Sequence, residues 1–206
     1  IGARQSQDEF AYALANALYW SGEISRSDSR LSELLFEAAG TVAAAIGLEY
    51  LEGRARYELT VSKGHRLRSQ NCYELATRQF SDAIEIVSEH EFLPDWEPVY
   101  ARANAHSAAL DTAGKHEGAV TVLEDAVTEM FEYDVHEEKL NHIIHHLEGQ
   151  KLETQAKIAD LADESETPVT LLAEAQTHYD VIDLARSTGR TEQHIDQARQ
   201  ADPDIV

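Results

Sequence analysis

Hydrophobic residues recur at intervals of three and four along most of this chain, which is the spacing of α-helices with one buried face. A first helix is predicted over residues 10–21, with Gly22 as its end. A longer apolar stripe then runs from Leu31 to Leu59. We interpret this stripe as one long helix of about 30 residues, and the alternative is two helices joined near Gly47.

Shorter helices follow, and Gly64 is taken as the boundary before them. Two helix–turn–helix pairs are predicted around Gly114 and Gly149, with further helices from Thr167 and over 191–201. The 10 glycines and 4 prolines are too few for a sheet-rich fold with many turns. The sequence therefore predicts an all-α fold of antiparallel helical hairpins.

The predicted hairpins recur at a nearly constant interval. The residues expected at equivalent places in successive second helices are Ala83, Ala119, Ala156 and His194. They lie 36, 37 and 38 residues apart. A single hairpin cannot bury its apolar face alone, so repeats of this length stack on their neighbours into a solenoid.

The segment from Ala103 to Met130 resembles a tetratricopeptide repeat, which has a small residue in its first helix, a glycine at its turn and packing alanines. The residues that carry the resemblance are Ser107, Leu110, Gly114, Ala119, Leu123 and Ala126. A more degenerate match extends from Arg66 to Pro203. The resemblance implies a short right-handed solenoid whose groove binds protein segments, and generic helical hairpins are the alternative.

Charge is distributed unevenly along the chain. Residues 1–80 contain 10 acidic and 9 basic residues, whereas residues 81–206 contain 28 and 8, giving a net charge of −21. Together with the repeat spacing, this predicts a near-neutral N-terminal helical part over 1–64 and an acidic hairpin array over 65–206. The acidic composition resembles that of haloarchaeal proteins, because concentrated salt screens repulsion between surface carboxylates.

Cys72 is the only cysteine, so an intramolecular disulfide is impossible and a reducing, cytoplasmic location is expected. We expect neither a secretory leader nor a membrane span, because the longest stretch of low polarity is far too short to cross a bilayer. His65 and Arg68 lie near Cys72 in sequence and suggest an activated thiol. A packed, unreactive cysteine is the favoured interpretation.

Histidines form the main candidate for a metal site. His136, His142 and His146 could bind one ion, since residues four apart share a helix face, and His145 lies beside them. Apolar neighbours claim the buried stripe of the same helix, so a solvated histidine face without metal is favoured. No cofactor is expected.

A basic stretch stands out against the acidic chain. Its residues are Arg54, Arg56, Lys63, Arg66, Arg68 and Arg78. They could form a docking surface for nucleic acid or for an acidic partner, and Asn71 and Asn104 are further candidates for partner contacts. The alternative, which we favour slightly, is that the arginines pair with acids of the hairpin array.

Apolar residues on the N-terminal helices exceed what one core needs and predict a homodimer as a further possibility. The leading function is a non-catalytic scaffold or adaptor that binds a basic peptide or helix in its groove. One alternative is a regulatory or sensor module of a nucleic-acid-associated protein, acting through the basic stretch or through a domain upstream of Ile1. Another is a metal-dependent enzyme that uses the histidine cluster.

Overall fold

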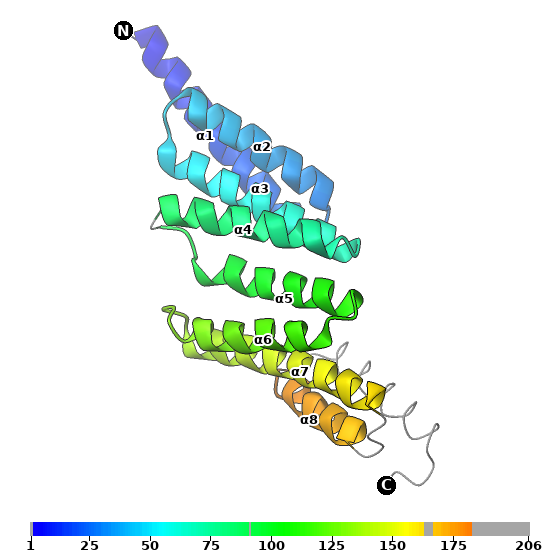
Figure 1. Cartoon of the computed structure of the whole chain (residues 1–206). Coiled ribbons are helices and arrows are strands. Elements are labelled where there is room, and N and C mark those ends of the chain that lie inside the picture. Colours follow the sequence, from blue (N-terminus) through cyan, green and yellow to red (C-terminus); the bar gives the residue numbers. More distant parts are fainter. Residues whose placement is uncertain (1, 91, 163–166, 183–206) are drawn as a thin grey trace. The chain divides into compact units, whose positions relative to one another are not determined.

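The computed structural model describes residues 2–90, 92–162 and 167–182, and over these residues the chain forms eight α-helices and no strand (Figure 1). The helices are α1 (Gly2–Ile24), α2 (Ser29–Ala45), α3 (Glu49–Ser69), α4 (Tyr73–Glu89), α5 (Trp96–Thr112), α6 (His116–Met130), α7 (Glu137–Leu161) and α8 (Thr167–Val181). Helices that follow one another in sequence pack together, as α1 with α2, α2 with α3 and α7 with α8 do. The all-α prediction is confirmed. Within the described residues, no helix has the length and apolar character required to span a bilayer.

The chain divides into two compact units, unit 1 over residues 1–102 and unit 2 over residues 103–206, and we consider each unit separately. Unit 1 contains 16 acidic and 10 basic residues, and unit 2 contains 22 and 7. The predicted segments 1–64 and 65–206 follow charge and repeat spacing instead of compactness. The predicted boundary at residue 64 lies inside α3.

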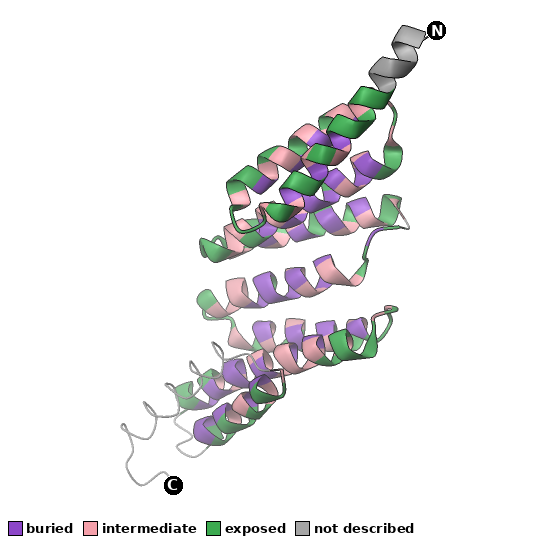
Figure 2. Ribbon diagram, turned by 180° about the vertical axis from the view of Figure 1, so that it is seen from behind, coloured by how far each residue is buried: buried purple, intermediate pink, exposed green. Residues whose placement is uncertain are grey.

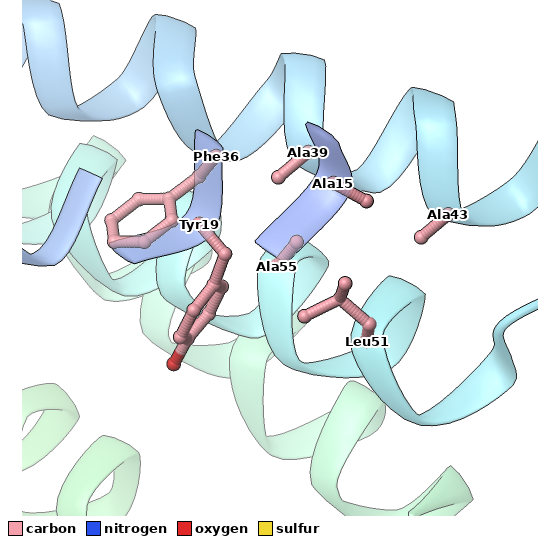
Figure 3. Packing of buried hydrophobic residues seen from close by; sticks show 7 residues of the cluster. All are labelled: Ala15, Tyr19, Phe36, Ala39, Ala43, Leu51 and Ala55. Atoms are coloured by element: carbon pink, nitrogen blue, oxygen red, sulfur yellow. The ribbon is translucent and has the colours of Figure 1, made fainter. Parts of the chain in front are cut away.

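Small side chains let the first three helices of unit 1 approach closely. Their core contains Ala15 and Tyr19 of α1, Phe36, Ala39 and Ala43 of α2, and Leu51 and Ala55 of α3 (Figure 3). Alanines facing one another shorten the distance between helix axes, and the two aromatic rings fill the remaining space. In unit 2, Leu152 of α7 packs with Ala175 and Tyr179 of α8 in the corresponding way.

The stripe from Leu31 to Leu59 is two helices, so the prediction of one long helix is wrong. Gly47 has a φ of +69°, a left-handed conformation that glycine adopts without steric cost. The turn at Gly47 reverses the chain between α2 and α3, which pack against each other. The alternative of a break near Gly47 is the one that the structure confirms.

Three glycines predicted to end or break helices instead lie inside them, each beneath an aromatic ring of the next helix. A Cβ atom on Gly22 would lie 2.8 Å from the ring of Phe36, and one on Gly64 would lie 2.6 Å from the ring of Phe80. A Cβ atom on Gly149 would likewise lie 2.6 Å from the ring of Tyr179. The absence of a side chain therefore allows close helix packing at these positions.

These contacts correct the repeat spacing. Gly22, Gly64, Ser107 and Gly149 lie in α1, α3, α5 and α7, at intervals of 42, 43 and 42 residues. Ser107 is the buried small residue at the place where a glycine would be expected. Ala83 and Ala119 lie in α4 and α6, the second helices of their hairpins, as predicted, but Ala156 lies in α7, a first helix, so the interval of 37 residues to Ala156 does not join equivalent positions. His194 and the helix predicted over 191–201 lie outside the described residues.

Candidate functional site

A group of charged and aromatic residues links three helices of unit 1. We call it the Arg26 cluster, and its members are Glu23, Arg26, Tyr57, Glu58 and Glu97. Glu23 lies near the end of α1, Arg26 in the turn that follows, Tyr57 and Glu58 in α3, and Glu97 in the first turn of α5. The cluster therefore joins residues that are up to 74 positions apart in sequence.

Two carboxylates hold the Arg26 guanidinium. Its Nε and Nη2 atoms donate to the two Glu23 oxygens at 3.1 and 3.0 Å, and Nη2 also donates to Glu58 Oε2 at 2.6 Å. Bidentate geometry of this kind is specific for a guanidinium. The Arg26 side chain remains 47% exposed, whereas that of Glu58 is 10% exposed. The acidic half of the site is thus formed by the helices, and the cation comes from an accessible turn.

Burial raises the pKa of Glu58 to about 7, and the nearby Glu23 and Glu97 carboxylates add to the increase although Arg26 opposes it. The charge of Glu58 is therefore sensitive to any change in its surroundings near neutral pH. A second cation brought close to Glu58 would favour its ionised form and release a proton.

Two buried tyrosines border the cluster. The Tyr57 hydroxyl donates to Glu97 Oε2 at 3.0 Å, and burial together with Glu97 raises the pKa of Tyr57. The Tyr19 hydroxyl is also buried, and the Glu23 carboxylate lies near it. Burial followed by the Glu58 carboxylate raises the pKa of Tyr19, and its hydroxyl points away from the alanines of the core (Figure 3). Each of the two buried hydroxyls therefore lies beside a glutamate of the cluster, Tyr57 beside Glu97 and Tyr19 beside Glu23.

Arg54 connects the cluster to an open pocket of about 310 Å³. Its guanidinium carbon lies 5.4 Å from the centre of the Tyr19 ring and 5.8 Å from that of Tyr50, within the range of cation–π interaction. The pocket lies between α1 and the start of α3, and its lining comprises Tyr12, Asn16, Gly47, Leu48, Glu49, Tyr50 and Leu51. Arg54 thus lies between Tyr50, which lines the pocket, and Tyr19, which borders the cluster.

Two arginines of the basic stretch form ion pairs within unit 1. Arg66 donates to Glu33 of α2 at 2.7 and 3.2 Å, and Arg56 donates to Glu89 of α4 at 3.0 Å. The favoured prediction was pairing with acids of the hairpin array, and Arg56 follows it whereas Arg66 pairs with the N-terminal part. The remaining basic residues of the stretch are half-buried at Lys63 and Arg68 and exposed at Arg78.

Of the two asparagines proposed as partner contacts, one lies in a turn and the other is buried. Asn71 has a φ of +59° in the turn between α3 and α4, a conformation that asparagine tolerates better than most residues. Its side-chain oxygen accepts a hydrogen bond from the Tyr73 hydroxyl at 2.8 Å. Asn104 is buried in α5, and its backbone carbonyl accepts a hydrogen bond from Ser107 at 3.2 Å.

The histidine cluster is not arranged as a metal centre. No group of three or more histidine, cysteine, aspartate or glutamate side chains in the described part of the chain is placed to hold an ion. His136 is exposed just before α7, whereas His142 and His146 are half-buried along it, so the favoured solvated face holds for His136 and only in part for the other two. His145 instead lies 2.9 Å from His178 of α8, between the two Nδ1 atoms.

Cys72 is exposed in the turn before α4, so the favoured prediction of a packed cysteine is also wrong. Its thiol lies 3.7 Å from the carbonyl oxygen of Gln70. Exposure follows from the position of Cys72 at the helix boundary, where a side chain points into solvent.

Unit 2 contains a second polar link, between α5, α6 and α7. Asp111 Oδ2 accepts a hydrogen bond from Lys157 Nζ at 2.5 Å, and Asp111 Oδ1 is hydrogen-bonded with His116 Nδ1 at 2.8 Å. Burial raises the pKa of Asp111, but the bonds to Lys157 and His116 outweigh it and lower the pKa below its ordinary value. The acid here is fully ionised and held by two partners.

The residues of the Arg26 cluster were not among the sites predicted from the sequence. One signal for Glu58 was present, because Leu51, Ala55 and Glu58 follow the four-and-three spacing of the buried face of α3. A carboxylate on such a face requires a partner. No local pattern indicated Arg26 as that partner. No protein-family model matches this chain, and no curated protein matches its sequence.

Proposed function

We propose that this chain is a non-catalytic scaffold, similar to tetratricopeptide proteins in the stacking of its hairpins, that binds a basic segment of a partner protein at the Arg26 cluster. The observation that carries the proposal is the bidentate grip of Glu23 and the buried Glu58 on an accessible guanidinium. A site that already holds an arginine side chain has the chemistry to hold another.

Binding would depend on attraction between a cationic side chain of the partner and the carboxylates of the cluster. An arginine or lysine of the partner approaches Glu23, Glu58 and Glu97, and the half-exposed Arg26 turns outward to make room. The oxygen of the buried Tyr19 hydroxyl accepts a hydrogen bond from the incoming cation, which has only donors to offer. The acidic exterior attracts basic partners and repels acidic ones.

Internal pairing makes the basic stretch a weaker candidate for a nucleic-acid surface. Arg56 and Arg66 already bind glutamates, and Arg54 lies against tyrosine rings. Direct nucleic-acid binding predicts retention of a DNA or RNA oligonucleotide at low salt, lost when Lys63 and Arg68 are replaced by glutamine. Absence of retention would leave protein binding as the function to pursue.

Selection from a displayed library of random 12-residue peptides tests the proposal. We expect enrichment of arginine and lysine, and the strongest peptide should bind at least about tenfold more weakly to a Glu23→Gln/Glu97→Gln variant. Replacing the peptide's arginine by citrulline, which keeps the shape and removes the charge, should have a similar effect.

The matched control is Glu117→Gln/Glu124→Gln, which removes the same charge from two exposed acids of α6. It should change the affinity less than about twofold, because neither residue belongs to the Arg26 cluster and exposed charges are screened by salt. Equal losses in both double variants would mean that net charge alone attracts the peptide, and would reject the Arg26 cluster as the site.

A further inference from the structure

Helix α1 has two unlike faces. Its buried face consists of Ala15, Tyr19 and Gly22, which pack against α2 and α3. At about 100° per residue, a second set of side chains lies roughly opposite Ala15, on the far side of the helix. That set is Phe10, Ala13, Ala17, Trp20 and Ile24, and every member is exposed. We call it the α1 seam, and Figure 2 shows exposed positions running along this helix.

The α1 seam has the spacing of a helix–helix contact. Its members are separated by three, four, three and four residues, which is the a/d pattern of a coiled coil. Phe10 is 70% exposed, Trp20 58% and Ile24 84%, so large apolar surfaces face outward. Such a pattern fits another helix better than it fits an extended peptide or a small ligand.

The α1 seam is also almost free of charge. Between Phe10 and Ile24 the only charged residue is Glu23, whose carboxylate is already bonded to Arg26. The whole chain carries −21, so two copies repel each other through most of their surfaces. A neutral apolar stripe is the surface through which such copies can meet.

We propose that the α1 seam binds the α1 seam of a second copy of this chain, with the two helices antiparallel. In the antiparallel register, Ile24 of one copy packs against Ala13 of its partner, and Trp20 packs against Ala17. Each of these layers combines one large and one small side chain, so the seam from Ala13 to Ile24 is complementary to itself, and Phe10 lies beyond these layers. A parallel pair would instead oppose Trp20 with Trp20 and Ala17 with Ala17, leaving crowded and empty layers in turn.

The charge of the chain adds a diagnostic dependence on salt. Screening weakens repulsion between the acidic copies, while apolar burial does not weaken with salt. Dimerisation through the α1 seam should therefore strengthen as potassium chloride is raised to about 1 M. Association through ion pairs would show the opposite trend.

Sedimentation equilibrium of the full 206-residue chain tests the proposal. We expect a dimer whose dissociation constant rises at least about tenfold in the Ala17→Glu variant, because a charge is placed in the middle of the seam. Ala17 is exposed, so the substitution leaves the core of unit 1 intact. The matched control is Ala44→Glu, at an exposed position of α2 outside the seam, and it should retain wild-type association.

Disulfide trapping tests the orientation. On a Cys72→Ser background, chains carrying Ala13→Cys are mixed with chains carrying Ile24→Cys. The antiparallel seam predicts mixed disulfides, whereas crosslinks between two Ala13→Cys chains would overturn it. A chain that stays monomeric at all salt concentrations, or association equally sensitive to Ala44→Glu, would also overturn the proposal. Loss of peptide binding without loss of the dimer would affect only the Arg26 cluster.

Discussion

Glu58 in unit 1 and Asp111 in unit 2 each join helices through a carboxylate, yet their surroundings move the two pKa values in opposite directions. Burial dominates at Glu58, raising its pKa to about 7 in spite of Arg26. At Asp111, hydrogen bonds to Lys157 and His116 overcome the effect of burial and lower the pKa. Deep burial and neighbouring carboxylates thus favour the neutral form of Glu58, whereas two hydrogen-bonding partners favour the ionised form of Asp111.

The helical framework around these acids is shared between the units. Gly64 in unit 1 and Gly149 in unit 2 both lie against an aromatic ring of the following helix. The same packing thus supports an acid with a raised pKa in one unit and an acid with a lowered pKa in the other. The glycine–ring contacts therefore belong to the packing of both units, whereas the pKa of each acid depends on the polar residues around it.

The largest effects are expected from breaking the shared framework. Gly64→Ala and Gly149→Ala each place a Cβ atom 2.6 Å from a ring and should lower the free energy of unfolding of their own unit by about 2–3 kcal/mol. Denaturant unfolding combined with amide hydrogen exchange measures the loss and locates it. Gly118→Ala is the control, since its Cβ atom would lie 3.6 Å from Leu110 and should be tolerated. Equal stability of all three variants would contradict the packing role.

A smaller effect is expected from Glu58→Gln, which keeps the shape and removes the titration. Between about pH 4.5 and 7, folded Glu58 holds a proton that the unfolded chain has lost, so wild-type stability falls as the pH rises. The stability of the variant relative to wild type should therefore increase by roughly 2 kcal/mol from pH 4.5 to 8. Glu124→Gln, at an exposed position of α6, provides the control, and a difference that does not vary with pH would reject the raised pKa.

Asp111→Asn should give the smallest change and the opposite dependence on pH. Ionised Asp111 stabilises unit 2 above the ordinary aspartate pKa, and this contribution is lost as acid protonates the folded state. The variant should be about 1 kcal/mol less stable at pH 7, with the deficit shrinking toward pH 3. Urea unfolding across this range measures it, with Asp125→Asn as the exposed control. A deficit that grows in acid would refute the assignment.

Helix positions were largely predictable from the sequence, but it was not predictable which glycines end a helix and which lie inside one. Gly47 and Gly114 lie in turns with φ of +69° and +71°, as a helix-breaking residue should. Gly22, Gly64 and Gly149 look the same in sequence and lie within helices. The distinguishing feature is an aromatic ring located 14 to 30 residues further along the chain, which local patterns do not register.

The candidate site was less predictable than the fold. Histidine spacing on α7 indicated side chains near one another, but the contact that forms is between His145 and His178 of the next helix. Arg26 and Glu58 lie 32 residues apart and meet only because α1 and α3 belong to the same unit. A sequence identifies a carboxylate on a buried face, but it does not identify the cation that approaches it.

The sequence by itself determined that the chain is helical, that apolar stripes bury one face of each helix and that charge is concentrated toward its second part. These properties depend on residue spacing and composition, which act over a few turns of helix. Tertiary structure alone decided which glycines lie beneath rings, which arginines are paired within unit 1 and why Glu58 and Asp111 differ. Those outcomes depend on desolvation and on contacts between distant residues, which exist only after the helices have packed.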